Sequence, residues 1–316
     1  MTRVRTMFHA PAPGGRERAA GKQRGVAFVL VLWVIVMLAI LLGSFSLIAR
    51  TESLQSRHLF DSTQARYAAE AGLNLAIYEL RKSDPLQQWI GDGRPYAFDF
   101  GDAKIEVRIT DDSGKLDINT ADINRLTSLF MTRGLELEQA QSIAAAVIDW
   151  RDPDDDSQPN GAEISEYKAA GLRYGPKNAP FDTVSELQQV LGMNYALFAA
   201  LEPSLTIYSG RTDPNAAYAS TPEALMATGC EREQAEQLIQ QRQALGTAEM
   251  AAAGLTGCDG TSPVVAGGGG LTYSVKSRAT LPNGASTILD ATIRMGGVSV
   301  AGRPFVILRW RDGETS

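Results

Sequence analysis

The stretch that decides the fold is RGVAFVLVLWVIVMLAILLGSFSLIARTE, residues 24–52. From Val26 to Ile48 it contains no charged side chain. As a helix this segment would extend for roughly 35 Å, enough to cross the hydrocarbon core of a bilayer. A secretory signal peptide has a shorter apolar region that ends in a cleavage site of small residues. Here the basic residues and Gly25 precede the apolar region, so we predict a retained membrane-spanning helix over residues 26–48.

The charges on the two sides of this helix differ. Residues 1–25 carry six basic side chains and one acidic side chain, Glu17. Because basic flanking segments stay in the cytoplasm, we predict a cytoplasmic leader and an exported chain after Arg50. The formal net charge of the whole chain is −6, so residues 26–316 carry −11. An exported part this acidic disfavours nucleic acid and favours cations or basic proteins as partners.

The helical pattern continues beyond the apolar region with one apolar face. Between Thr51 and Lys82, alanine, leucine and isoleucine recur at helical spacing, and Pro85 ends the pattern. One helix from Val26 to about Lys82 would be roughly 85 Å long. Because its second half is amphipathic, that half needs a folded domain to pack against.

Strand patterns lie on both sides of a long helical segment. Alternating apolar residues between Phe98 and Ile109, with a turn at Gly101–Asp102, predict β-structure. Four glycines, residues 267–270, predict a flexible joint, and three strands follow with a hairpin turn at Pro282–Gly284. The predicted fold class is α+β, with a long helix, a small antiparallel sheet and a large helical insertion. The predicted parts are a leader (1–25), a membrane helix (26–48), an amphipathic helix with the first strand (49–116), the helical insertion (117–266) and the C-terminal strands (267–316).

The helical insertion contains a weak repeat in which a polar cap precedes a leucine-bearing helix. Thr183 and Glu186 form a capping box, and Pro222 suits a first helical position. A short helix, a turn and a longer helix are typical of the SAM-like or helix-hairpin-helix class. Some domains of that class bind duplex DNA through amides and basic residues that hold phosphates. With 21 acidic against 9 basic residues in this segment, protein contact is favoured over DNA binding.

Two cysteines, Cys230 and Cys258, lie in the same insertion. In an oxidising compartment they could form a disulfide that stabilises its loop by about 3 kcal/mol. They could equally be two small buried apolar side chains. The sequence leaves both alternatives open.

The sharpest chemical signal is DWRDPDDDSQPNGAEISEY, residues 149–167. Counted from Asp152, its acidic residues match positions one, three, five and twelve of a calcium-binding loop, although Ser157 replaces the glycine of position six. Clustered carboxylates on a proline-restrained loop would repel one another without a cation. We therefore predict a calcium site, with a solvated acidic turn as the alternative. The predicted ligands are Asp152, Asp154, Asp156 and Glu163, with Asp149 and Asp155 as further candidates.

Motifs of known catalytic chemistry are not found in the sequence. The two histidines, His9 and His58, fall in the leader and in the helix that follows the apolar region. The nucleophile-elbow, zinc-protease and phosphate-loop patterns do not occur. We therefore expect a protein that is not an enzyme.

Several motifs, taken in order, resemble one known family. A basic leader that ends in glycine, an apolar helix, an amphipathic continuation and a small sheet resemble a type IV pilin or pseudopilin. Within that group the chain is similar to the minor pseudopilin K of type II secretion systems, over about residues 22–210. The motifs that carry this resemblance are RGVAFVLVLWVIVMLAILLGSFSLIARTE, ARYAAEAGLNLAIYEL, DDSGKLDINTA, IDWRDPDDD with GAE, and PFDTVSELQQVLGM.

The resemblance implies a processing site and an assembly role. A prepilin peptidase would cut between Gly25 and Val26 and leave the apolar helix on the mature protein. Most pilins carry a glutamate at the fifth mature position, where this chain has Leu30. A carboxylate in lipid is costly unless it is paired, so a subunit that has no predecessor in the fibre can dispense with it. Leu30 therefore fits a subunit that starts the fibre and occupies its tip.

The same resemblance implies the setting and the partners. The chain would be a single-pass inner-membrane protein with a periplasmic C-terminal domain. Its partners would be the I- and J-type minor pseudopilins, the prepilin peptidase, and secreted cargo or the outer-membrane channel. The alternatives are a membrane-anchored helix-hairpin-helix protein that binds DNA and a minor pilin of a type IV pilus.

Overall fold

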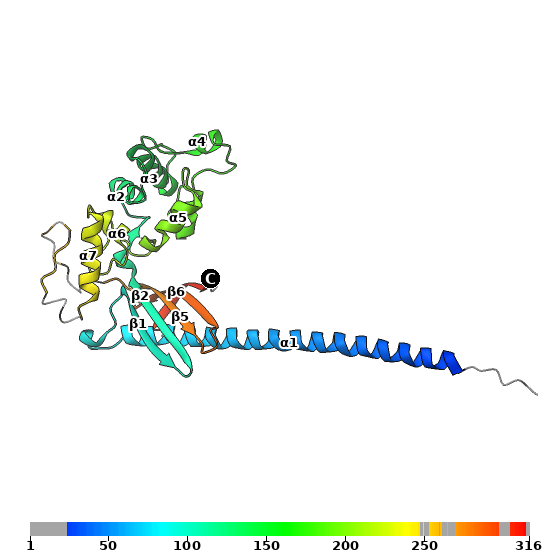
Figure 1. Cartoon of the computed structure of the whole chain (residues 1–316). Coiled ribbons are helices and arrows are strands. Elements are labelled where there is room, and N and C mark those ends of the chain that lie inside the picture. The colour runs from blue at the N-terminus through cyan, green and yellow to red at the C-terminus, as the bar shows by residue number, and fades with distance from the viewer. Residues whose placement is uncertain are drawn as a thin grey trace, which may run out of the picture. The chain divides into compact units, whose positions relative to one another are not determined.

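The computed structural model describes residues 24–246, 249, 253–258, 260, 264, 269–296 and 304–313. The predicted leader falls almost entirely outside these residues. The chain divides into two compact units, residues 1–59 and 60–316. Helix α1 (Arg24–Leu80) is continuous along the chain, as predicted, and begins and ends within two residues of the predicted limits (Figure 1).

In the first unit, the described residues are all helical. The side chains of its apolar segment are exposed along their whole length, from Val26 to Ile48. By length and composition this helix could cross a membrane. Exposed leucine, isoleucine and valine all around a helix are what a bilayer, rather than water, would solvate.

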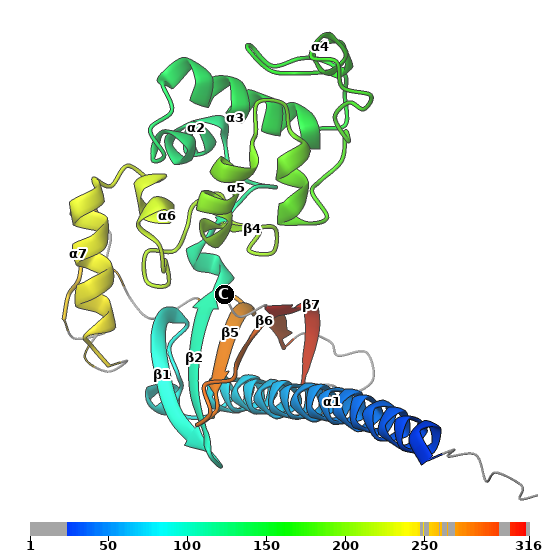
Figure 2. The ribbon, with the colours of Figure 1, turned by 45° about the vertical axis from the view of Figure 1, so that its right-hand side comes forward.

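The second unit is built on a five-stranded antiparallel sheet. Its strands are β1 (Asp92–Phe100), β2 (Ala103–Asp111), β5 (Thr272–Thr280), β6 (Ser286–Met295) and β7 (Phe305–Gly313). Their order in the sheet is β1-β2-β5-β6-β7, and Figure 2 shows them side by side with α1 along one side. The two predicted turns, at residues 101–102 and 282–284, connect β1 to β2 and β5 to β6.

Helix α1 packs on the sheet through small side chains. Ala65, Ala69 and Ala76 are fully buried against a sheet core that includes Val107 and Ile293. Small residues let the helix backbone approach the strands closely, and the amphipathic second half of α1 thus has the partner that the sequence required.

The helical insertion runs between β2 and β5. Its helices are α2 (Ile123–Met131), α3 (Leu137–Arg151), α4 (Ile164–Ala169), α5 (Tyr195–Leu201), α6 (Pro222–Met226) and α7 (Arg232–Gln243). Two short parallel strands, β3 (Leu116–Asp117) and β4 (Leu205–Thr206), also pair within it. Short 3-10 helices lie at Pro85–Gln87, Asp112–Gly114, Val184–Gln189 and Glu202–Ser204.

The insertion has two apolar cores. The larger core gathers side chains of α2, α3 and α5 around Phe130, Trp150 and Leu201, and the smaller one lies under α6 and α7. The capping box of Thr183 and Glu186 is confirmed, but the element that it starts, Val184–Gln189, is a 3-10 helix rather than an α-helix. The SAM-like class of the insertion stays a prediction.

The expected glycine joint has a different role where it is described. The Gly270 N–H donates to both carboxylate oxygens of Asp111, at 2.8 and 3.1 Å. A Cβ on Gly269 would lie 2.7 Å from Asp111 Oδ2 and 3.1 Å from the ring of Tyr218. These two glycines therefore allow a close approach of the backbone rather than flexibility.

Candidate functional site

The acidic cluster lies on a loop between two helices, as the sequence pattern predicted. Helix α3 ends at Arg151, the loop covers residues 152–163, and α4 begins at Ile164 with Glu163 as its N-cap. The Glu163 N–H donates to Glu166 Oε2 at 2.9 Å, which fixes the second end of the loop. The helix ends thus hold both limits of the loop in place.

Asp149 organises the loop from the last turn of α3. It is 0% exposed, and its two oxygens accept the backbone N–H groups of Gln158 at 3.0 Å and Ala162 at 2.6 Å. Burial raises the pKa of this carboxyl group, while the two backbone hydrogen bonds oppose that change. A Cβ on Gly161 would lie 2.0 Å from Asp149 Oδ2, so only glycine fits there. Asp149 therefore folds the loop, and its oxygens already have protein donors.

Glu163 and Asp152 carry the oxygens that lack such donors. Glu163 is 4% exposed, and its side chain faces the Glu166 N–H in the capping box that starts α4, but neither carboxylate oxygen makes a hydrogen bond. Oδ1 of Asp152 is also buried without a partner. Burial and the neighbouring carboxylates, led by Asp149 and Asp152, raise the pKa of Glu163 to about 7. A buried carboxylate without a donor is costly, so this arrangement is suited to a cation.

The remaining predicted ligands lie on the exposed part of the loop. Oδ1 of Asp154 accepts the N–H of Asp156 at 3.0 Å and so makes a local turn. Oδ1 of Asp155 accepts a hydrogen bond from the Nδ2 of Asn178 at 2.9 Å. Asp156 is exposed. The structure thus places Asp152 and Glu163 at the buried side of the cluster and the other three at its outer side.

Asn178 is a member of the cluster that the sequence did not indicate. Its Nδ2 also donates to the Asp154 carbonyl at 3.0 Å, and its Oδ1 is buried without a partner. Its backbone has a φ of +51°, which asparagine tolerates better than most residues. Nothing in the motif GPKNAPFD marks this residue as a ligand, because the contact joins segments 23 residues apart.

The donor set fits a hard cation such as Ca²⁺. In the part of the chain that the structure describes, the buried carboxylate and amide oxygens without partners belong to Asp152, Glu163 and Asn178. Calcium prefers carboxylate and amide oxygens of this kind. Among the described residues, however, no three acidic, histidine or cysteine side chains already stand in a ligating arrangement. The cluster would therefore have to close around an ion.

The predicted processing and assembly residues lie at the start of α1. The helix begins at Arg24, so Gly25 and Val26 are in its first turn. The side chains of Val26 and Leu30 are 68% and 62% exposed. An exposed leucine at the fifth position of the expected mature helix is available to lipid or to another helix.

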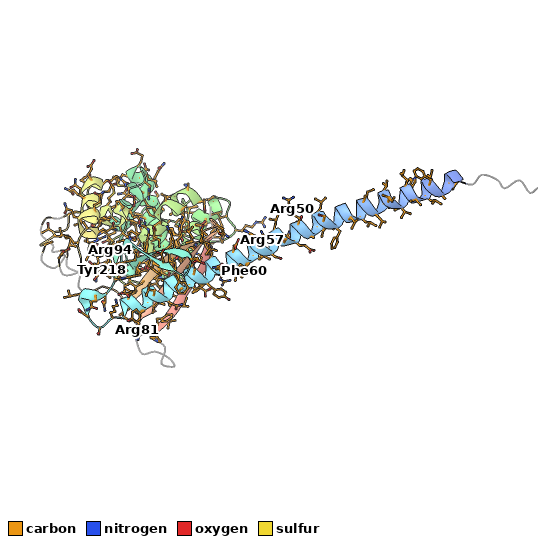
Figure 3. The ribbon with its side chains drawn as sticks, turned by 60° about the horizontal axis from the view of Figure 1, so that its bottom comes forward. Arg50, Arg57, Phe60, Arg81, Arg94 and Tyr218 are labelled. Carbon is orange, nitrogen blue, oxygen red and sulfur yellow. A yellow bond between two sulfur atoms is a disulfide. The ribbon has the colours of Figure 1, made fainter. Side chains whose placement is uncertain are left out.

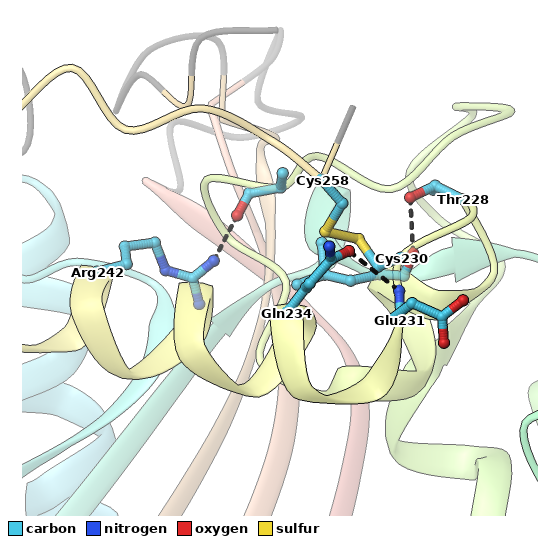
Figure 4. The surroundings of a disulfide bond; sticks show 8 residues. Thr228, Cys230, Glu231, Gln234, Arg242 and Cys258 are labelled. Atoms are coloured by element: carbon cyan, nitrogen blue, oxygen red, sulfur yellow. Dashed lines mark hydrogen bonds between the residues drawn. A yellow bond between two sulfur atoms is a disulfide. The ribbon is translucent and has the colours of Figure 1, made fainter. Parts of the chain in front are cut away.

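A disulfide closes the smaller core of the insertion. Cys230 and Cys258 are bonded, with their Cα atoms 5.2 Å apart, which decides between the two alternatives that the sequence left open. Figure 4 shows the bond beside the start of α7, where the Glu231 N–H donates to Gln234 Oε1 at 3.4 Å. The bond links Cys230, which directly precedes the N-cap of α7, to Cys258, 28 residues later in the chain.

Buried charges connect α7 to the first strand of the sheet. Asp92 and Arg242 are both 0% exposed, with Arg242 Nε 3.5 Å from Asp92 Oδ2. Arg94 pairs with the same carboxylate at 2.8 Å and donates to the carbonyls of Leu245 and Arg242. Arg242 in turn donates to the carbonyls of Ala216 and Ala219 (Figure 4). These two residues flank the segment of Tyr218, which is labelled with Arg94 in Figure 3. Because each buried charge has a partner, this junction fixes α7 against β1.

Comparison with known proteins identifies relatives of one kind. The family described as "Type II secretion system (T2SS), protein K" matches residues 107–210. Type II secretion system protein K of Klebsiella pneumoniae is 30% identical over 263 residues, which cover 73% of this chain and 78% of the relative. The protein of the same description from Pectobacterium carotovorum is 27% identical over 212 residues, 58% of this chain and 62% of the relative.

A solved structure has the same fold. It is a chain of the GspK-GspI-GspJ complex from enterotoxigenic Escherichia coli, with a TM-score of 0.52 and 20% sequence identity. The match covers 84% of this chain and 99% of that one. The helix, the antiparallel sheet and the helical insertion of the present chain are thus found together in that structure. By its sequence similarity to the Klebsiella pneumoniae protein, the chain belongs to the type II secretion system protein K family.

Proposed function

We propose that this minor pseudopilin starts the assembly of the type II secretion pseudopilus and occupies its tip. The observation that supports this most directly is a pilin-type helix on a sheet in which two neighbouring inner strands, β2 and β5, carry a large helical insertion. A subunit in the middle of a fibre must leave room for neighbours on both sides. A bulky insertion is compatible with an end position, where one side is free.

Leu30 supports the same position. A glutamate at the fifth place of a mature pilin helix would be buried in lipid and would need a partner amine. Leucine needs none, and its exposed side chain is compatible with lipid contact. We therefore place this subunit first in the fibre, with no role as an enzyme.

The processing and the location follow from the same chain. We propose that prepilin peptidase cuts between Gly25 and Val26 and that the apolar part of α1 stays in the inner membrane. The disulfide between Cys230 and Cys258 supports a periplasmic location for the rest, because such bonds persist in oxidising compartments.

The partners are proposed by analogy with the solved relative, which is a GspK-GspI-GspJ complex. We expect the full chain, solubilised in detergent with the other minor pseudopilins of its own system, to co-purify with the I- and J-type proteins. Co-purification with the pilins of a twitching pilus instead would overturn the assignment. Secreted cargo and the outer-membrane channel are further expected partners at the tip.

The acidic loop is proposed to bind calcium and to hold the insertion in its folded form. Asp152, Glu163 and Asn178 would supply the buried oxygens, and Asp154, Asp155 and Asp156 the outer ones, while Asp149 holds the loop backbone. The support is the set of buried oxygens without donors and the mutual repulsion of the carboxylates. A bound Ca²⁺ would neutralise this repulsion and so stabilise the junction of α3 with α4.

DNA binding is the competing function for a helical insertion of this class. Helix α7 has Glu231 as its N-cap and Glu233 in its first turn, and these carboxylates would repel phosphates. Salt-dependent binding of duplex DNA by the full chain at physiological ionic strength would favour that function over ours.

A further inference from the structure

The sheet has one face that α1 does not cover, and that face is basic. On β2, the side chains of Lys104, Glu106 and Arg108 alternate with the buried Ile105 and Val107, so they point away from the core. On β5, Lys276 and Arg278 are exposed in the same way. We call Lys104, Arg108, Lys276 and Arg278, with Glu106 among them, the basic sheet face. It carries a net charge of +3, in a chain whose exported part is strongly acidic.

The strand register places these charges next to one another. Arg108 lies directly opposite Lys276, and Glu106 lies opposite Arg278. Two like charges in directly opposed positions destabilise an antiparallel pair. The Arg108–Lys276 pair therefore does not serve the stability of the isolated sheet.

Three carboxylates lie near this face. Asp99 on β1 lies opposite Lys104 and lowers the net charge of the region to +2. Glu106 Oε1 accepts from Arg108 Nε at 3.0 Å. Asp290, which lies opposite Lys276 on β6, is 3.0 Å from Arg309 and 3.6 Å from Arg311 on β7. Among the described residues, no carboxylate forms an ion pair with Lys104, Lys276 or Arg278. The positive charge of this face thus remains available to a partner.

The chemistry of the face favours a protein over a lipid surface or a nucleic acid. Glu106 stands within the basic residues, and a continuous layer of phosphates would repel it. A folded protein can instead present carboxylates to the lysines and a neutral or basic group to Glu106.

We propose that the basic sheet face is the docking surface for an acidic face of a neighbouring minor pseudopilin. This inference rests on the proposed function, since it is the assembled fibre that would supply such a neighbour. Exposed charges affect the orientation and the association rate of a partner more than its affinity. We expect this contact to act on the neighbouring subunit in the same way.

The two lysines allow a direct test. A carbodiimide joins lysine amines to carboxylates without a spacer, so only groups in contact react. In the detergent-solubilised complex of the full chain with its I- and J-type partners, mass spectrometry should find cross-links from Lys104 or Lys276 to partner carboxylates. Lys168, an exposed lysine on α4, is the internal control and should give none. The Lys104→Arg/Lys276→Arg variant should lose the cross-links and still retain the partners, because its charge is unchanged.

Charge removal gives an independent measurement. At physiological ionic strength, the Lys276→Gln/Arg278→Gln variant should retain about fivefold less partner protein than the unmodified chain. At higher salt the difference in retained partner between the two should become smaller, because salt screens exposed charges. Lys168→Gln/Arg173→Gln removes the same charge from the insertion and should change retention less than twofold. The melting temperature of the first variant should change little, because relief of the Arg108–Lys276 repulsion offsets the lost attraction between Arg278 and Glu106.

Four results would overturn the inference. Equal retention by the two glutamine variants would show that the basic sheet face does not dock a partner. Cross-links from Lys104 or Lys276 to a second copy of this chain, or binding of the complex to anionic phospholipid vesicles that these substitutions abolish, would assign the face to another partner. Failure of the unmodified chain to retain either pseudopilin would overturn the proposed function together with this inference.

Discussion

Replacing Glu163 with glutamine should change stability in opposite directions with and without calcium. The side chain is buried, neither oxygen has a donor, and its pKa is raised to about 7. In chelator at pH 7.5 the carboxylate is charged and destabilises the native state. Glutamine removes that charge at nearly constant shape, so the variant should be more stable than the unmodified chain without calcium and less responsive to it.

The magnitude follows from the change in pKa. A rise from 4.5 to about 7 corresponds to a destabilisation on the order of 1–3 kcal/mol, because the loop can relax. Since the folded-state pKa is the higher one, this cost is absent below pH 4.5, grows as the pH rises, and is complete above about pH 7. Calcium at a hundredfold excess over its Kd would add about 2.7 kcal/mol to the native state.

Unfolding of the full chain in detergent, followed by tryptophan fluorescence, measures both effects. Trp150 reports on the site, since it packs against Phe181 with ring centroids 6.0 Å apart. Calcium should raise the melting temperature of the unmodified chain by about 5–10 °C and that of Glu163→Gln by much less. The control is Glu138→Gln, which changes an exposed side chain on α3. Its free energy of unfolding should differ from that of the unmodified chain by less than about 0.5 kcal/mol. A Glu163→Gln variant that is less stable in chelator at pH 7.5, or that responds fully to calcium, would refute the reasoning.

Three further substitutions test other parts of the chain. Gly25→Phe should block removal of the leader, because a peptidase site built for glycine cannot admit a ring; an unchanged mature N-terminus by mass spectrometry would contradict the processing site. Gly161→Ala should cost about 1–3 kcal/mol and weaken the calcium response, because the new Cβ would displace Asp149 from the loop backbone; an unchanged melting temperature in calcium would speak against that role. Arg242→Met should cost about 3 kcal/mol in chemical unfolding, since Asp92 would keep one buried partner of two; a cost below about 1 kcal/mol would mean that the pair contributes little.

The sequence predicts the elements of the fold well because each rests on a local pattern. The limits of α1, the two hairpin turns, the cap at Thr183 and the start of α6 at Pro222 depend on residues within a few positions of one another. The order of the strands follows less directly. Strand β2 pairs with β5, although the whole insertion separates them in the sequence. Composition and periodicity do not predict such a long-range pairing.

The candidate site divides in the same way. The acidic loop is visible in the sequence, but the separate roles of its residues depend on burial. Asp149 and Glu163 are both acidic residues of the same motif. In the structure, both carboxylate oxygens of Asp149 accept backbone hydrogen bonds, whereas the carboxylate oxygens of Glu163 make none. Asn178 and the Asp92–Arg242 pair bring together residues that are distant along the chain, so no spacing rule could find them.

The attachment of the insertion to β2 and β5 has a mechanical consequence. The two strands are neighbours and antiparallel, and the chain leaves β2 and enters β5 at the same end of the sheet. A load on the insertion along the strands would therefore move β2 and β5 together, and would be passed to β1 and β6 as shear. Shear loads every hydrogen bond of a strand pair at once, whereas peeling an edge strand breaks them one after another. An insertion attached to two inner strands, rather than to an edge strand, is thus suited to transmitting a push without opening the domain that carries it.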